Sequence, residues 1–163
     1  MKSLAIAFTG PSGSGKTTLI EKISLKLTPK YNVSIIKHDP SNKATFDTKG
    51  KDSYRFFQTG ANVAIVSNEK TAIFKHKSSN MSELISYLKP FDILMVEGLK
   101  NWSLPRIGVF RNKIEKEYLP YLTAIAVDNS IDKEEIKDLD VDILDLNNID
   151  MIIEYIFKHS KKV

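Results

Sequence analysis

Short apolar runs alternate with stretches of helical periodicity from the start of the chain. Residues 4–8 form a continuous apolar run that ends at Thr9-Gly10, which predicts a buried strand. Residues 16–27 place apolar side chains at helical spacing, and Pro29 follows them. Residues 33–36 are mostly β-branched and predict a second strand. This strand–helix–strand order is the unit of a parallel sheet.

The alternation continues through the rest of the chain. Residues 52–59 predict a helix, 63–67 and 71–75 a β-hairpin, and 82–88 another short helix. Apolar runs at 93–96, 106–110, 123–127 and, more weakly, 143–146 predict further strands, and residues 149–156 predict a last helix followed by a basic frayed end. We therefore predict one α/β domain over residues 1–163, with a mainly parallel central sheet flanked by helices and a β-hairpin extension.

Composition narrows the class of protein. The chain has 163 residues, of which 42% are hydrophobic and 27% charged, as in soluble globular domains. No apolar run approaches the roughly 18 residues of a membrane helix, and the apolar stretch near the N-terminus leads directly into a glycine loop. The chain has no cysteine, which excludes disulfide scaffolds, zinc–thiolate sites and thiol nucleophiles. We expect a cytoplasmic protein without a signal peptide or a membrane segment.

The charge balance favours a small anionic ligand over nucleic acid. The formal net charge is +4 from 24 basic and 20 acidic residues, and the basic residues are scattered along the chain. Only Arg55, Arg106 and Arg111 are arginines, the residue type that planar recognition of bases usually requires. We therefore expect no nucleic-acid partner.

One motif carries specific chemistry. Residues 10–17 read GPSGSGKT, which satisfies the phosphate-loop pattern G-x-x-x-x-G-K-[ST] between a predicted strand and a predicted helix. Glycines allow the backbone N–H groups of such a loop to converge on an anion at a helix N-terminus. Lys16 would bridge the β- and γ-phosphates, and Thr17 would offer its hydroxyl to Mg²⁺. The alternative is a glycine-rich turn that only caps a helix.

A phosphate loop also needs a carboxylate at the end of a neighbouring strand to organise the metal. Glu97 directly follows the run ILMV and is the first candidate. Asp128 after TAIAV is the second, with a place near the base as its alternative. Asp92 precedes the same run as Glu97, so it lies at the wrong end and is expected to act as a cap. The alternative for Glu97 is an exposed carboxylate at a strand end.

The segment 37–55 concentrates the remaining polar chemistry. Asp47 or Asp52 could reach Mg²⁺ or an attacking water, and Lys49 and Lys51 could meet a second anion. His38 has no visible second metal ligand near it. Residues 38–50 lack periodicity and are long for a connection, which favours a functional loop over a spacer. The alternative is a solvated charged loop.

Together these motifs resemble the MobB family, the accessory GTP-binding proteins of molybdopterin-guanine dinucleotide synthesis. The resemblance extends in order along nearly the whole chain. Its matching segments are GPSGSGKTTL at 10–19, IIKH at 35–38, D-x-x-GKDS at 47–53, Gly60-Ala61, DILMVEGLK at 92–100, RIGVFR at 106–111 and VDILDLNNID at 141–150.

The resemblance implies a P-loop fold that binds GTP with Mg²⁺, has weak GTPase activity and forms a homodimer. It also implies partnership with a MobA-type guanylyltransferase, which joins GMP from GTP to the molybdenum-carrying pterin, and leaves direct binding of molybdopterin open. It assigns phosphate binding to Gly13, Ser14, Gly15, Lys16, Thr17 and Thr18, metal binding to Thr17 and Glu97, and the second loop to Asp47, Lys51 and Asp52.

The chain departs from that family in one place. Family members often carry more histidines directly after the Lys-His pair, whereas the segment DPSNKATF that follows His38 has none, so no histidine cluster is expected there. No N-K-x-D motif follows an apolar strand, so the sequence leaves the choice between GTP and ATP open, with Asn129 a guess at a base contact.

Three other functions fit a phosphate loop. A small-molecule kinase would transfer the γ-phosphoryl group, but such kinases usually close an arginine-bearing lid over it, and the chain has too few arginines for one. A partner-regulated ATPase would carry an early second lysine, whereas Pro11 and Ser12 stand there. A vestigial loop would not keep Lys16 and Thr17 intact.

Overall fold

The computed structural model describes residues 3–163, which divide into two units. The first unit comprises the residues up to His38 together with Leu88–Val163, and the second comprises Asp39–Tyr87. Each unit has its own sheet. The phosphate-loop motif and the larger sheet both belong to the first unit.

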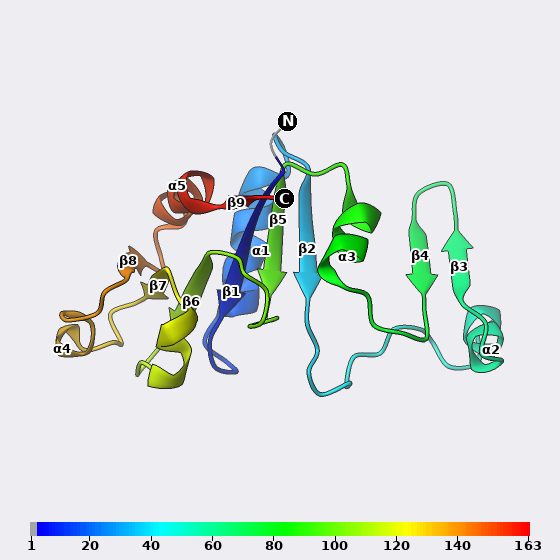
Figure 1. Ribbon diagram of the computed structural model, residues 1–163, viewed down its shortest axis with the longest axis horizontal. Helices are drawn as coiled ribbons and strands as arrows, with labels where there is room; N and C mark the ends of the chain where they lie inside the picture. The colour runs from blue at the N-terminus through cyan, green and yellow to red at the C-terminus, as the bar shows by residue number, and fades with distance from the viewer. Residues whose placement is uncertain (1–2) are drawn as a thin grey trace. The chain divides into compact units, whose positions relative to one another are not determined.

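The sheet of the first unit is mainly parallel, as predicted. Its strand order is β2 (Val33–Lys37), β5 (Ile93–Glu97), β1 (Leu4–Thr9), β6 (Arg106–Phe110), β7 (Ala124–Val127) and β8 (Asp142–Asp145), as Figure 1 shows. Every neighbouring pair in this order is parallel. The predicted strands and the α/β class are confirmed.

Two amphipathic helices bury one face of this sheet. They are α1 (Lys16–Leu27) and α5 (Ile149–His159), which contacts β8 and β1. In Figure 1, α1 lies behind β1 and β5. Ile20 and Ile23 of α1 join Ile152 and Ile156 of α5 in one core cluster with inward-facing side chains of the strands. The apolar residues that recur at helical spacing in the sequence are the ones that this face of each helix buries.

Three short elements escaped the sequence prediction. A 3₁₀ helix, η1 (Lys116–Tyr121), and a four-residue helix, α4 (Lys133–Ile136), contribute Tyr118, Leu119 and Ile136 to a second cluster around Phe110. The expected frayed end is wrong, because β9 (Lys161–Lys162) pairs antiparallel with Leu4 and Ala5 of β1. Elements this short show no periodicity, so only tertiary contacts determine them.

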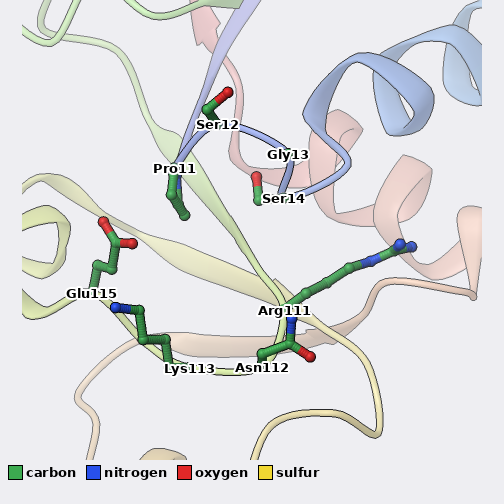
Figure 2. A pocket seen from close by; sticks show the side chains of 8 residues that line it. All are labelled: Pro11, Ser12, Gly13, Ser14, Arg111, Asn112, Lys113 and Glu115. Atoms are coloured by element: carbon green, nitrogen blue, oxygen red, sulfur yellow. The ribbon is translucent and has the colours of Figure 1, made fainter.

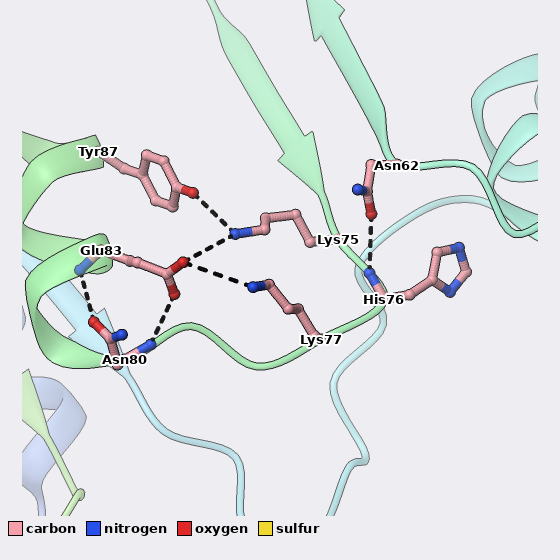
Figure 3. A network of polar contacts seen from close by, with 7 residues as sticks. All are labelled: Asn62, Lys75, His76, Lys77, Asn80, Glu83 and Tyr87. Atoms are coloured by element: carbon pink, nitrogen blue, oxygen red, sulfur yellow. Dashed lines mark hydrogen bonds and ion pairs between the residues drawn. The ribbon is translucent and has the colours of Figure 1, made fainter.

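The second unit contains α2 (Asp52–Gln58), the antiparallel hairpin β3 (Val63–Val66) and β4 (Thr71–Phe74), and nearly all of α3 (Met81–Leu88). The predicted helices and hairpin are confirmed. Polar contacts link α3 to the end of β4, as Figure 3 shows. Asn80 and Glu83 cap the start of α3 reciprocally, with N–H···O distances of 2.9 and 3.1 Å, and Glu83 also pairs with Lys75 at 3.7 Å.

Apolar side chains of the second unit are poorly covered. None of the residues in α2, β3, β4 or α3 is buried, although these elements carry many apolar side chains. Phe46 is 76% exposed and Val66 73%. In soluble proteins, apolar patches that stay exposed are often sites of interaction.

The order of strands indicates where a ligand would bind in the first unit. The chain passes from β1 to strands on one side of it, β5 and β2, and then returns to the other side with β6. In open α/β sheets, ligands bind outside the carboxyl ends of the strands where the direction of winding changes. That point lies between the ends of β1 and β6. No helix among residues 3–163 is long and apolar enough to cross a membrane.

Candidate functional site

The loop between β1 and α1 has a backbone that only glycine adopts readily. Gly10, Gly13 and Gly15 have φ values of 138°, 76° and 95°. Gly15 is the N-cap of α1, so the free N–H groups of the first helical turn follow directly on the loop. This arrangement fits the anion-binding loop predicted from the sequence.

Gly10 also lies too close to the backbone of β6 for any side chain to fit there. A Cβ on Gly10 would lie 2.3 Å from the carbonyl oxygen of Val109 in β6. The adjacent Ser14 is buried, and its Oγ has no hydrogen-bond partner among the described residues. A buried hydroxyl without a partner is costly in the free protein, and a phosphate oxygen at the loop would give it one.

Lys16 lies across the loop that precedes it. Its ammonium donates to the carbonyl oxygens of Gly10 at 2.9 Å and Pro11 at 2.6 Å. Burial lowers the pKa of Lys16, nearby Glu97 raises it, and Lys37 lowers it, with the net direction downward. A half-buried cation held above an open loop is suited to bind phosphate oxygens.

Glu97 lies where the structure brings β1, β5 and β2 together. It pairs in register with Phe8 of β1 and with Lys37 of β2. Its carboxylate accepts from Lys37 Nζ at 3.1 Å, and its side chain is 14% exposed. Glu97 therefore lies at the carboxyl edge of the sheet, close enough to Lys16 to affect its pKa, and its role in metal binding stays a prediction. Asp92 instead accepts from the N–H of Asn32 at 2.9 Å, at the opposite end of β5.

A buried arginine holds the segment that follows Glu97. Arg106 is 1% exposed and donates to the carbonyl oxygens of Gly98 at 2.6 Å, Leu99 at 2.9 Å and Trp102 at 3.3 Å. Burial lowers its pKa. Because these carbonyls belong to the turn after β5, Arg106 fixes the backbone beside the Glu97 carboxylate. It therefore positions this backbone segment.

A second arginine lies at the end of β6 beside the phosphate loop. Arg111 Nε pairs with Asp128 Oδ2 at 3.1 Å. The pKa of Asp128 is lowered, chiefly by the hydroxyl of Ser130, which donates to it, and partly by Arg111. Ser130 Oγ also accepts from the N–H of Asn112 at 2.8 Å. These contacts join the turns after β6 and β7.

A pocket of about 300 Å³ separates the phosphate loop from the turn after β6 (Figure 2). It lies at the point where the winding of the sheet reverses. Its lining residues are Pro11, Ser12, Gly13, Ser14, Arg111, Asn112, Lys113 and Glu115. The lining combines loop backbone with charged side chains of both signs, which suits a polar anionic ligand.

The residues present fit a nucleotide with Mg²⁺. The glycine loop offers backbone donors, Ser14 has an unsatisfied buried hydroxyl, and Lys16 supplies a positive charge. Thr17 and Thr18 stand exposed in the first turn of α1. Thr17 and Glu97 also line one hollow between α1 and β2, so a hydroxyl and a carboxylate are both available to a metal ion there.

The second-loop residues belong to the other unit. Asp47 accepts from the N–H of Thr48 at 2.7 Å through one oxygen, while its other oxygen is buried without a partner among the described residues. Lys51 is the N-cap residue of α2 and Asp52 its first residue, and both side chains are exposed. Their roles in catalysis and nucleotide binding stay predictions.

Sequence reasoning missed Lys37, Arg106 and Arg111 as members of this site. Lys37 follows an apolar run just as Glu97 does, so its place at the same sheet edge was open to inference. Arg106 begins a strand and Arg111 follows its end, and nothing in their spacing indicates that one is buried and the other lies beside the loop.

Comparisons with known proteins agree with this geometry. The family model of MobB, molybdopterin guanine dinucleotide synthesis protein B, matches residues 5–130. A molybdopterin-guanine dinucleotide biosynthesis adapter protein of Haemophilus influenzae is 33% identical, over 93% of this chain and 86% of that protein. An Escherichia coli protein of the same description is 27% identical, over 96% and 93%. The crystal structure of Bacillus subtilis MobB superposes with a TM-score of 0.75 at 24% identity, covering 97% of this chain and 98% of the other.

Two glycine substitutions distinguish the cost of a steric overlap from the cost of an unfavourable φ angle. Gly10→Ala should lower the free energy of unfolding by about 3 kcal/mol, because its Cβ would overlap the Val109 carbonyl. Gly13→Ala should cost only about 1 kcal/mol, because its Cβ has no neighbour within 4 Å and only φ is unfavourable. Urea unfolding of the two variants without nucleotide measures the difference, and equal losses would contradict the close approach.

Proposed function

The chain belongs to the MobB family, and from this premise we propose that it is a GTP-binding adaptor protein of molybdenum cofactor biosynthesis. In this role it would assist the conversion of molybdopterin to its guanine dinucleotide form. The observation that carries the proposal is the phosphate loop, with Lys16 above it and Glu97 beside it, at the point where the sheet changes winding. The family relatives named as adapters of this pathway support it.

The proposed roles follow from the geometry of the first unit. The backbone of Gly13, Ser14 and Gly15 would bind the β-phosphate, with Lys16 turning from its carbonyl partners to the β- and γ-phosphates. Thr17 and Glu97 would hold Mg²⁺, directly or through water. When bound, Mg²⁺ would neutralise charge on the phosphate oxygens.

We propose that hydrolysis is slow. Fast phosphoryl transfer needs positive charge placed on the transferred group. Arg106 is occupied by three backbone carbonyls, and Arg111 is paired with Asp128. On the family resemblance, we assign to the second loop the roles of orienting water, for Asp47, and of contacting the nucleotide, for Lys51 and Asp52. An adaptor that presents GTP to another enzyme has no need of rapid turnover.

We also propose that the protein acts as a homodimer in the cytoplasm and presents GTP to a MobA-type guanylyltransferase. The second unit supports the dimer, because its apolar side chains are left uncovered in the single chain. Ile65 is 40% exposed, Ile73 55% and Phe56 60%, all within a unit of about fifty residues. A second copy of the chain would cover such a surface. Direct binding of molybdopterin is a further part of this proposal.

Replacement of Lys16 tests the phosphate loop. Lys16→Met should weaken binding of GTP with Mg²⁺ at least tenfold, because the charge that bridges two phosphates is lost while the length of the side chain is retained, a loss of order 1.4 kcal/mol or more. Isothermal titration calorimetry measures the affinity. Lys22→Met, on the exposed side of α1, is the matched control and should bind normally. Unchanged affinity in Lys16→Met would contradict the phosphate role.

Replacement of Glu97 tests its proposed role in binding Mg²⁺. Glu97→Gln should slow Mg²⁺-dependent GTP hydrolysis about tenfold or more with little loss of stability, because the amide keeps the shape and loses the charge. Phosphate release at several Mg²⁺ concentrations measures the effect, with Glu154→Gln on the exposed surface of α5 as control. An unaltered rate would move the metal role to Asp47 or Asp52.

Light scattering tests the dimer and the surface that forms it. The wild-type protein should have about twice the chain mass of 18.4 kDa. Val66→Asp should shift the mass toward the monomer, because a buried unpaired carboxylate opposes the contact. Leu25→Asp, at a residue 70% exposed against 73% for Val66 but in the first unit, should leave the dimer intact. A monomeric wild type, or the reverse result for the two variants, would refute this interface.

A further inference from the structure

Arg111 presents a flat surface at the start of α1. An ideal Cβ on Gly15 would lie 3.6 Å from both Cζ and Nε of Arg111 and 3.7 Å from Nη2. A point nearly equidistant from three atoms of a planar group, and far beyond their bond lengths, lies above the plane. One face of the guanidinium therefore covers Gly15, at ordinary van der Waals distance. Figure 2 shows the side chain extending away from Lys113 and Glu115.

The orientation of this plane is fixed from one edge. Asp128 Oδ2 pairs with Arg111 Nε at 3.1 Å, and Ser130 in turn donates a hydrogen bond from its hydroxyl to Asp128. Ser130 is itself anchored by the N–H of Asn112, the residue after Arg111. The hydroxyl also helps to keep Asp128 ionised, since it lowers the pKa of that carboxyl. The guanidinium is thus held on two sides, by Gly15 below and by Asp128 at its edge.

With one face over Gly15 and Nε paired with Asp128, the opposite face and the Nη edge are what remain for a ligand. The Arg111 side chain keeps 46% of its surface exposed despite these two contacts, and it lines the pocket beside the phosphate loop. A guanidinium plane with one covered face and one open face is a stacking surface for a flat group, and nucleic-acid bases stack on arginine in this manner.

The geometry disfavours a phosphate as the partner of Arg111. Arginine binds phosphate with an N–H edge, as a fork, and here the edge that contains Nε is committed to Asp128. The phosphates already have the loop backbone and Lys16. The remaining flat part of a nucleoside triphosphate is its base.

We propose that Arg111, held by Asp128 and Ser130, is the platform on which the base of the bound nucleotide stacks. The proposal rests on the nucleotide binding proposed above. It gives the chain a base-binding surface although no N-K-x-D segment is present. The stack itself recognises any base, so it contributes affinity and positioning and leaves the choice between guanine and adenine to other groups.

A ligand without a base separates this proposal from the phosphate site. Calorimetry would compare GTP with inorganic tripolyphosphate, both with Mg²⁺, on the full-length wild type and on Arg111→Lys. Lysine keeps the positive charge and removes the plane. We expect Arg111→Lys to weaken GTP roughly 5- to 100-fold, the range for loss of one stacked base, and to change tripolyphosphate less than twofold.

Two further variants sharpen the comparison. Asp128→Asn removes the charge that holds Nε while keeping the size of the side chain, so it should weaken GTP by a smaller factor and leave tripolyphosphate unchanged. Lys133→Ala, an exposed lysine of α4, is the control for altered surface charge and should bind both ligands as the wild type does. Thermal unfolding of each variant verifies that it is folded.

Each outcome has a distinct meaning. A loss confined to GTP supports the platform. An equal loss for GTP and tripolyphosphate would overturn it, since Arg111 would then act on the phosphates, and no loss for either ligand would overturn it as well. If the wild type bound tripolyphosphate and GTP equally weakly or not at all, the proposed nucleotide function itself would fail.

Discussion

The close approach of the Gly10 backbone to the Val109 carbonyl is the constraint on which the site depends. It requires two parallel strands, β1 and β6, to lie side by side with their carboxyl ends level, and their register meets that requirement. Only glycine fits there. After that contact, the chain turns through two further glycines with positive φ, Gly13 and Gly15, before α1 begins. The backbone N–H groups of this loop are then free to converge on an anion.

The charges around the loop are arranged in two ion pairs and one half-buried cation. Lys37 with Glu97 lies on the β2 side, and Arg111 with Asp128 lies on the β6 side. Lys16 stands between them, bound to backbone carbonyls and partly desolvated. Binding of a triphosphate would therefore exchange the hydrogen bonds of Lys16 to carbonyl oxygens for ion pairs with phosphate oxygens. The Lys37–Glu97 pair would then flank the metal, and the Arg111–Asp128 pair would flank the base.

Much of this was predictable, because apolar patterning and the phosphate motif act locally. The strand runs, α1 and the hairpin show plainly in the sequence, and Glu97 was placed correctly because strand ends in a parallel sheet share one edge. The pairing of Lys161 and Lys162 with β1, and the contrast between buried Arg106 and open Arg111, were not predictable. They depend on which side chains meet across the fold, and sequence spacing carries no record of that.

The guanine preference of the wild-type protein is the central claim, and it can be measured directly. Separate calorimetric titrations with GTP and ATP, each with Mg²⁺, decide it. We expect clear binding of GTP and markedly weaker binding of ATP, as an adaptor for a guanylyltransferase requires. A preference for ATP would contradict the proposed function and favour transfer of a phosphoryl group to a small acceptor.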